Sequence, residues 1–141
     1  MVPRAVVDTN VLVAGLWSRG GASFRLLELM RLKRVEPALS VPLVLEYEMV
    51  LKRRVADLGL TLVDVDAVLD LLCAVGHHQR IHFLWRPSLR DPRDELVLEL
   101  AVAADCQQIV TFNLRDFAGS ERFDVEALTP VAFLRSIGEA Q

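Results

Sequence analysis

Four acidic residues stand beside apolar segments, where carboxylates can do chemistry: Asp8, Glu46, Asp94 and Asp116. Asp8 follows a short apolar run, and Asp116 comes soon after a second one. Glu46 lies on the edge of an apolar helical stripe, and Asp94 lies in the first turn of a strongly apolar helix. Buried carboxylates are costly unless they are paired or bound to a cation, so their convergence on one cleft would create a divalent-cation site.

The chemistry of this acidic set points to a hard metal ion. The candidate ligands are rich in oxygen, without cysteine, and the histidines His77, His78 and His82 lie away from them in the sequence. Such ligands suit Mg²⁺ or Mn²⁺ rather than zinc. The reaction that this kind of site supports is phosphoryl transfer, in which metal ions activate water and stabilise the leaving oxygen.

Each acid also has a purely structural interpretation. Asp8 could cap the helix that follows it, and Asp91 could cap the next apolar helix, with Asp94 completing a capping box. Asp116 could close a capping arrangement with Asn113. Spacing alone leaves these alternatives open.

Glu46 carries a similar ambiguity. It is as consistent with exposure at the edge of the apolar stripe as with burial, and Glu48 occupies the corresponding place on the opposite edge. The stripe alone does not select one of the two glutamates.

Strands that alternate with helices would have to position these acids. Hydrophobic periodicity predicts strands over 5–7, 37–41, 80–85, 108–111 and 125–128, and helices directly after residue 8 and over 22–33, 43–55, 62–75, 94–104 and 131–137. This alternation predicts an α/β fold with a central parallel sheet covered on both faces. Ligands bind such sheets beyond the carboxyl ends of the strands, where the strand order reverses.

Composition sets further bounds. With 141 residues, 52% of them hydrophobic, we expect one domain over 1–141 with a well-filled core. The net charge of −3 excludes nucleic-acid binding through overall positive potential. Cys73 and Cys106 are interpreted as reduced buried thiols, and no signal peptide or membrane span is evident, so a cytoplasmic protein is expected.

Four segments, in this order and covering nearly the whole chain, resemble the PIN-domain nucleases. They are residues 6–13 (VVDTNVLV), Ser40 with 45–51 (LEYEMVL), 91–94 (DPRD) and 109–117 (IVTFNLRDF). Within that family the chain resembles the VapC-like toxin components of bacterial toxin–antitoxin pairs.

The resemblance implies a three-layer α/β/α fold and a ribonuclease whose acidic quartet holds Mg²⁺ or Mn²⁺. By motif, the first acid is Asp8, the second Glu46, the third Asp94 and the fourth Asp116. Many relatives have aspartate where this chain has Asn113, which becomes a neutral ligand or hydrogen-bonding neighbour. The residues implied to support the acids are Thr9, Asn10, Ser40, Asp91, Thr111 and Asn113.

The same resemblance implies the partners. They are a single-stranded RNA substrate, an antitoxin protein and a second copy of the chain in a homo-oligomer such as a dimer. The arginines that could contact RNA are Arg53, Arg54, Arg93 and Arg115. Leu16, Trp17 and Phe24 could form a groove for the antitoxin, although their interpretation as core residues is favoured.

Other functions stay open at this stage. One is a non-catalytic or weakly active interaction module, favoured by Asn113, and another is a structure-specific DNA nuclease. A ribonuclease that uses histidines as acid and base is a poorer fit. Without the four proposed ligands the formal charge is +1, so an acidic chain remains compatible with a phosphate substrate.

Overall fold

The computed structural model describes residues 1–81 and 92–139. Its strands are β1 (Arg4–Val7), β2 (Glu36–Leu39), β3 (His77–His78), β4 (Gln108–Val110) and β5 (Glu126–Leu128). Its helices are α1 (Thr9–Trp17), α2 (Ala22–Arg31), α3 (Val41–Arg53), α4 (Val55–Leu58), α5 (Leu62–Val75), α6 (Pro92–Ala103) and α7 (Pro130–Ser136). Two short 3₁₀ helices, η1 (Leu114–Phe117) and η2 (Ser120–Phe123), connect β4 to β5.

The five described strands form one parallel sheet in the order β3-β2-β1-β4-β5. From β1 the chain proceeds to one side through β2 and β3, and then crosses back to place β4 on the other side of β1. The strand order therefore reverses between β1 and β4. Val7 is in register with Val110 across that boundary, so Asp8 and Thr111 emerge side by side at the carboxyl ends.

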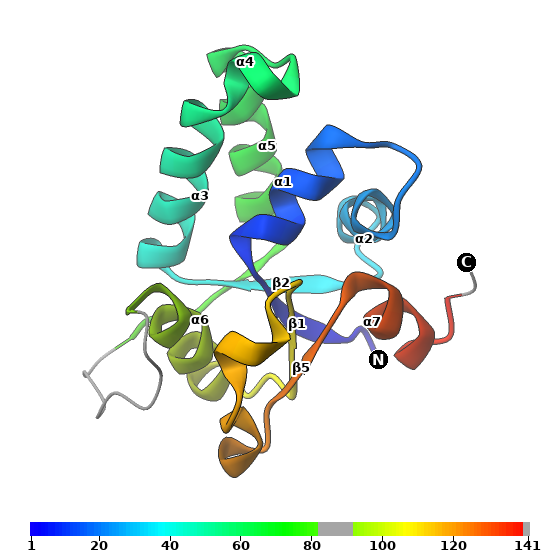
Figure 1. The fold of residues 1–141 in the computed structure, drawn as a ribbon, viewed down its shortest axis with the longest axis vertical. Helices are drawn as coiled ribbons and strands as arrows, with labels where there is room; N and C mark the ends of the chain where they lie inside the picture. Colours follow the sequence, from blue (N-terminus) through cyan, green and yellow to red (C-terminus); the bar gives the residue numbers. More distant parts are fainter. Residues whose placement is uncertain (82–91, 140–141) are drawn as a thin grey trace.

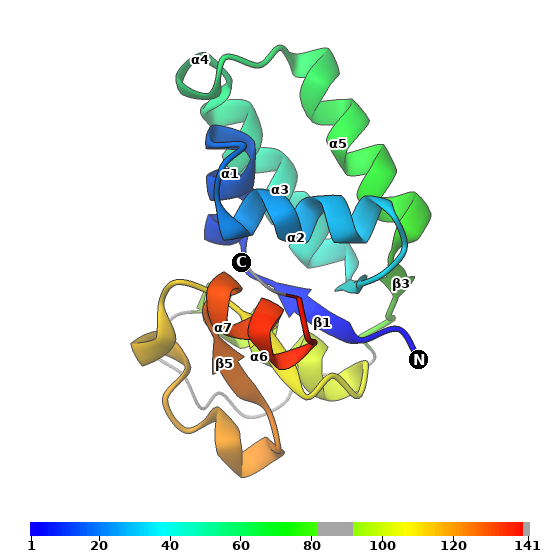
Figure 2. The same ribbon diagram turned by 90° about the vertical axis from the view of Figure 1, so that its right-hand side faces the viewer.

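Helices cover both faces of this sheet, as Figures 1 and 2 show. Helices α1 to α5 lie on one side of the strands, and α6 lies on the other, packed against β1, β2 and β4. Helix α7 contacts α2 and β5. The predicted three-layer α/β/α class is confirmed. Across the described residues, no helix combines the length and apolar character needed to cross a membrane.

The core explains why these segments pair as they do. Short strands such as β1 contribute residues that are buried on both faces, including Val6 and Val7. From α6, Leu98 and Leu100 are fully buried and pack into the same hydrophobic core. A strand covered on both faces must be apolar throughout, which is why β1 gave a clear signal in the sequence.

The predicted end of the second strand was wrong. Strand β2 stops at Leu39, and Ser40 caps α3 by accepting a hydrogen bond from the Leu43 backbone N–H at 3.3 Å. Pro42 lies in the first helical turn, where its missing N–H costs no intrahelical hydrogen bond. Pro42 therefore belongs to the first turn of α3, which begins two residues before the predicted helix.

The strand that pairs with β2 lies earlier in the chain than the strand predicted over 80–85. Residues 80–81 lie outside any strand, residues 82–85 fall outside the described residues, and the strand paired with β2 is β3 at His77–His78. Gly76 permits this early pairing, because a Cβ atom there would come within 2.9 Å of the Pro37 carbonyl oxygen. The chain thus passes directly from α5 into the sheet.

Candidate active site

Asp8 stands at the point where the strand order reverses. Its backbone N–H donates to the Val110 carbonyl oxygen at 2.9 Å, which extends the β1–β4 pairing by one residue. The side chain also caps α1, because Oδ1 accepts a hydrogen bond from the Thr9 N–H at 2.8 Å. The Thr111 hydroxyl donates to Oδ2 at 2.7 Å. Asp8 is therefore both a helix cap and a buried, fixed carboxylate.

The electrostatic environment of Asp8 opposes its ionisation. Burial raises the pKa of its carboxyl above the ordinary value of 3.8, while the hydrogen bonds from Thr111 and Thr9 act in the opposite direction. The negative charges of Glu46 and Asp116 raise the pKa further. A cation between these groups would relieve both the burial penalty and the repulsion.

Thr9 connects the first two acids. Its backbone N–H donates to Asp8, and its hydroxyl donates to Glu46 Oε2 at 2.5 Å. Thr9 is 7% exposed, and its hydrogen bond to Asp8 is buried, whereas the one to Glu46 is partly buried. This single residue therefore fixes Glu46 of α3 relative to Asp8, the residue after β1.

Tyr47, the residue after Glu46, fastens α3 to the sheet. Its hydroxyl donates to the Val7 carbonyl oxygen, directly beside Asp8. Tyr47 is 2% exposed, and burial raises the pKa of its phenol, so the hydroxyl remains a donor. The sequence gives no sign of this contact, because helical periodicity carries no information about the partner of a hydroxyl group.

The segment after β4 supplies the fourth acid. The Asn113 backbone N–H donates to the Thr111 hydroxyl oxygen at 3.0 Å, and the Asp116 N–H donates to the Asn113 carbonyl oxygen at 3.0 Å. Asn113 and Asp116 are exposed at the cleft. The Thr111 hydroxyl thus joins the Asp8 carboxylate to the turn that presents Asp116.

Helix α6 brings the third acid from the opposite layer. Asp94 lies in its first turn, half-buried, and Arg93 precedes it in an exposed position. Pro92 is the first residue of the helix, a position where its missing N–H costs no intrahelical hydrogen bond. Asp91, expected to cap α6 or support the acids, lies outside the described residues.

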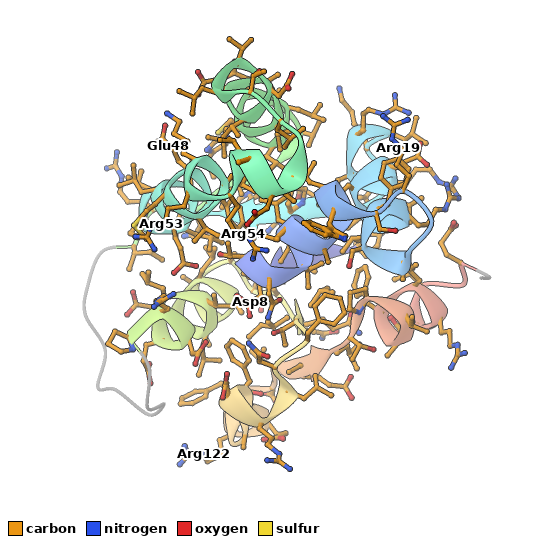
Figure 3. All side chains as sticks on the ribbon, turned by 45° about the horizontal axis from the view of Figure 1, so that its top comes forward. Asp8, Arg19, Glu48, Arg53, Arg54 and Arg122 are labelled. Atoms are coloured by element: carbon orange, nitrogen blue, oxygen red, sulfur yellow. The ribbon has the colours of Figure 1, made fainter. Side chains whose placement is uncertain are left out.

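These side chains line one cleft of about 710 Å³. Its charged and amide lining residues are Asp8, Asn10, Glu46, Arg54, Arg93, Asp94, Asn113 and Asp116. In Figure 3, Arg54 and Asp8 lie near the centre of the view, whereas Arg53 lies toward its edge. All four predicted acids are therefore brought to a single cavity, although they come from the residue after β1, from α3, from α6 and from η1.

Thr111 is buried and supports Asp8, as expected, whereas some other predicted residues stand elsewhere. Ser40 is buried as the cap of α3 and lies outside the cleft lining that the structure describes. Arg53 and Arg115 are exposed and lie outside the cleft lining that the structure describes. Trp17 is 61% exposed and lines the cleft, so its interpretation as a core residue was wrong.

The acids form an open set rather than a closed metal cage. Within the described residues, no three His, Cys, Asp or Glu side chains are arranged as a ready chelating group. Mg²⁺ accepts such an arrangement, since it keeps several waters and binds through one or two carboxylates together with substrate phosphate. Asn10 Oδ1 is buried and has no hydrogen-bond partner among the described residues. Because Asn10 lines the cleft, its side chain adds one more oxygen acceptor there. The donor set fits a hard divalent cation.

Comparison with known proteins supports this interpretation. A family model described as "PIN domain" matches residues 4–115, which include Asp8, Glu46 and Asp94 and end one residue before Asp116. The chain belongs to the PIN-domain family. PIN domains are generally nucleases that use divalent metal ions, so membership indicates a metal-dependent hydrolase of phosphodiester bonds. No curated protein matches the chain.

Proposed function

We propose that this PIN domain is an endoribonuclease that hydrolyses single-stranded RNA with Mg²⁺ or Mn²⁺ held by Asp8, Glu46, Asp94 and Asp116. The observation that carries the proposal is the gathering of these four acids in one cleft at the reversal of strand order. When bound, a divalent ion supplies an activated water and neutralises phosphate charge. No histidine base is then required.

The remaining residues of the cleft have positioning roles in this proposal. Thr9 and Thr111 fix the two carboxylates to which they donate, as hydrogen-bond partners of metal ligands do. Asn113 is a neutral ligand or a hydrogen-bonding neighbour beside Asp116. Arg54 and Arg93 present guanidinium groups to the RNA backbone from opposite layers of the fold.

The substrate assignment is tested by comparing nucleic acids. A labelled single-stranded RNA, a DNA of the same sequence, an RNA duplex and a DNA flap would each be incubated with Mn²⁺, Mg²⁺ or EDTA. We expect internal cleavage of the single-stranded RNA with either metal and none with EDTA. Faster cleavage of the DNA flap would favour a structure-specific DNA nuclease.

A non-catalytic interaction module is the second candidate, because Asn113 replaces an acid that many relatives carry. The cleft still contains Asp116 three residues later, within electrostatic reach of Asp8. This retention favours catalysis. The module would be favoured if the metal-loaded protein left every one of these nucleic acids intact.

The biological role that we propose is the toxin of a toxin–antitoxin pair, working as a homo-oligomer such as a dimer. The support is the resemblance of the four sequence segments to such toxins. The free thiols Cys73 and Cys106 fit a cytoplasmic location. Expression of the chain should arrest growth, and co-expression of a small adjacent gene should restore it; growth unaffected by the chain would contradict the toxin role.

A further inference from the structure

Two aromatic rings stand exposed on the wall of the acidic cleft. Trp17 is the last residue of α1 and is 61% exposed, and Phe112 follows β4 and is 49% exposed. Both line the cavity that contains Asp8. Neither ring is buried in the hydrophobic core, so a ligand in the cleft can contact both rings.

We propose that Phe112 and Trp17 form a base-stacking track, on which unpaired bases of the RNA lie while the acids act on a neighbouring phosphate. This inference rests on the proposed nuclease function and adds the feature of the substrate that is recognised. Nucleobases stack on aromatic rings irrespective of their sequence, because each base has a π face. Bases that are paired in a duplex cannot offer that face to a side chain.

The positions of the two rings order them along the strand. Phe112 directly follows Thr111, whose hydroxyl bonds Asp8, so this ring belongs to the subsite beside the acids. Trp17 lies eight residues beyond Thr9 on α1, which is about 12 Å along the helix axis. Stacked nucleotides advance about 3.4 Å each, so Trp17 serves a base several nucleotides from the phosphate that is cut.

Positive charge accompanies the rings. Arg54 and Arg93 line the same cleft as Asp8 and the two rings. Aromatic faces combined with cations that follow the backbone are the features by which proteins hold single strands. The rings thus select unpaired bases, and the arginines contact phosphates whatever the base.

The test measures affinity for a labelled single-stranded RNA by fluorescence anisotropy with Mg²⁺ present, in an Asp8→Asn background where cleavage is expected to be lost. Trp17→Ala and Phe112→Ala should each raise Kd roughly tenfold, whereas Trp17→Phe should largely restore affinity. Phe123→Ala is the matched control, because Phe123 lies on η2 outside the cleft lining and is 36% exposed.

An abasic scan of the same RNA separates stacking from other effects. Removing the base that Trp17 contacts should raise the Kd of the protein that retains Trp17. The same removal should change the Kd of the Trp17→Ala variant only slightly, because its stacking contact is already lost. Kd values of both alanine variants within twofold of the parent, or equal losses for base-containing and abasic RNA, would overturn the track. The same results would be obtained if Trp17 contacted only a protein partner, and they would overturn the track in that case too. If the Asp8→Asn protein cleaved RNA, only the metal role of Asp8 would be refuted. The anisotropy measured before cleavage proceeds would still give the Kd values that test the track.

Discussion

At the scale of single residues, Asp8 carries conflicting demands. It is 8% exposed, caps α1 and accepts the Thr111 hydroxyl, yet its burial and the neighbouring carboxylates disfavour its charge. A buried group that is unfavourable for stability but poised for a cation is typical of a functional site. Two predictions separate the effect of the residues around Asp8 on folding stability from their effect on cleavage.

Asp8→Asn should stabilise the metal-free protein at neutral pH by about 0.5–2 kcal/mol while abolishing cleavage. Because burial raises the folded-state pKa of Asp8, the wild type loses stability as pH rises from the ordinary value of 3.8 through the raised one. Urea unfolding in EDTA should therefore show the difference at pH 7 and little of it below pH 3.8. An Asp8→Asn protein less stable than wild type at pH 7 would refute this account.

Thr9→Val should reduce cleavage about 10- to 100-fold, because the hydroxyl that orients Glu46 is lost while the backbone hydrogen bond to Asp8 remains. Thr9→Ser keeps the hydroxyl and should stay within a few-fold of wild type. Single-turnover cleavage and Mn²⁺ affinity would be measured for both. Equal rates for the valine and serine variants would remove Thr9 from the positioning network.

At the scale of elements, the site depends on how α3 meets the sheet. Tyr47 donates to Val7 at the end of β1, and the adjacent Glu46 faces the cleft. One helical residue thus fixes the height of α3 above β1, and the next supplies an acid. Stability and activity should be coupled at this contact more than at other helix contacts.

Tyr47→Phe removes the donor to the Val7 carbonyl and should cost about 1–3 kcal/mol in free energy of unfolding, with a parallel fall in cleavage. Thr61→Ala is the control, since it removes the capping box of α5 at about 0.5–2 kcal/mol. Chemical denaturation and cleavage rates would be compared for both variants. If Thr61→Ala lowered cleavage as much as Tyr47→Phe, general destabilisation rather than this contact would be responsible.

Some of the elements could be predicted from the sequence and others could not. The apolar runs of β1 and β4 were found because strands covered on both faces are apolar throughout. The strand β3 was missed, since two histidines carry no apolar pattern and the pairing depends on the close approach of Gly76 to β2. The convergence of the acids followed from the strand-end rule and the family resemblance, whereas the hydroxyl contacts of Thr9 and Tyr47 depend on three-dimensional packing.

At the scale of the whole molecule, the proposed function requires an acidic chain to hold a polyanion. The net charge is −3, and four of the negative charges are the proposed metal ligands. Divalent ions bound there would reverse the local sign, so under this proposal RNA would be attracted to the cleft and not to the whole surface. Arg54 and Arg93 add positive charge at the same cleft.

Arg54→Gln should therefore weaken RNA binding and reduce the salt dependence of log K by about 0.7 in slope, the contribution of one phosphate contact on a single strand. Arg135→Gln on α7 is the control, because it is exposed outside the cleft lining and should leave the slope unchanged. Affinities would be measured at several salt concentrations with Mg²⁺ constant. Equal slopes for Arg54→Gln and wild type would exclude Arg54 from the phosphate path.

The most direct test of the acidic cleft compares two glutamates on one helix. Glu46 lines the cleft, whereas Glu48 lies outside its described lining and pairs with Lys52 at 3.0 Å. Cleavage of single-stranded RNA with Mn²⁺ would be measured for wild type, Glu46→Gln and Glu48→Gln. The account predicts a loss of about 100-fold or more for Glu46→Gln and a rate within twofold of wild type for Glu48→Gln. Wild-type cleavage by Glu46→Gln would contradict it.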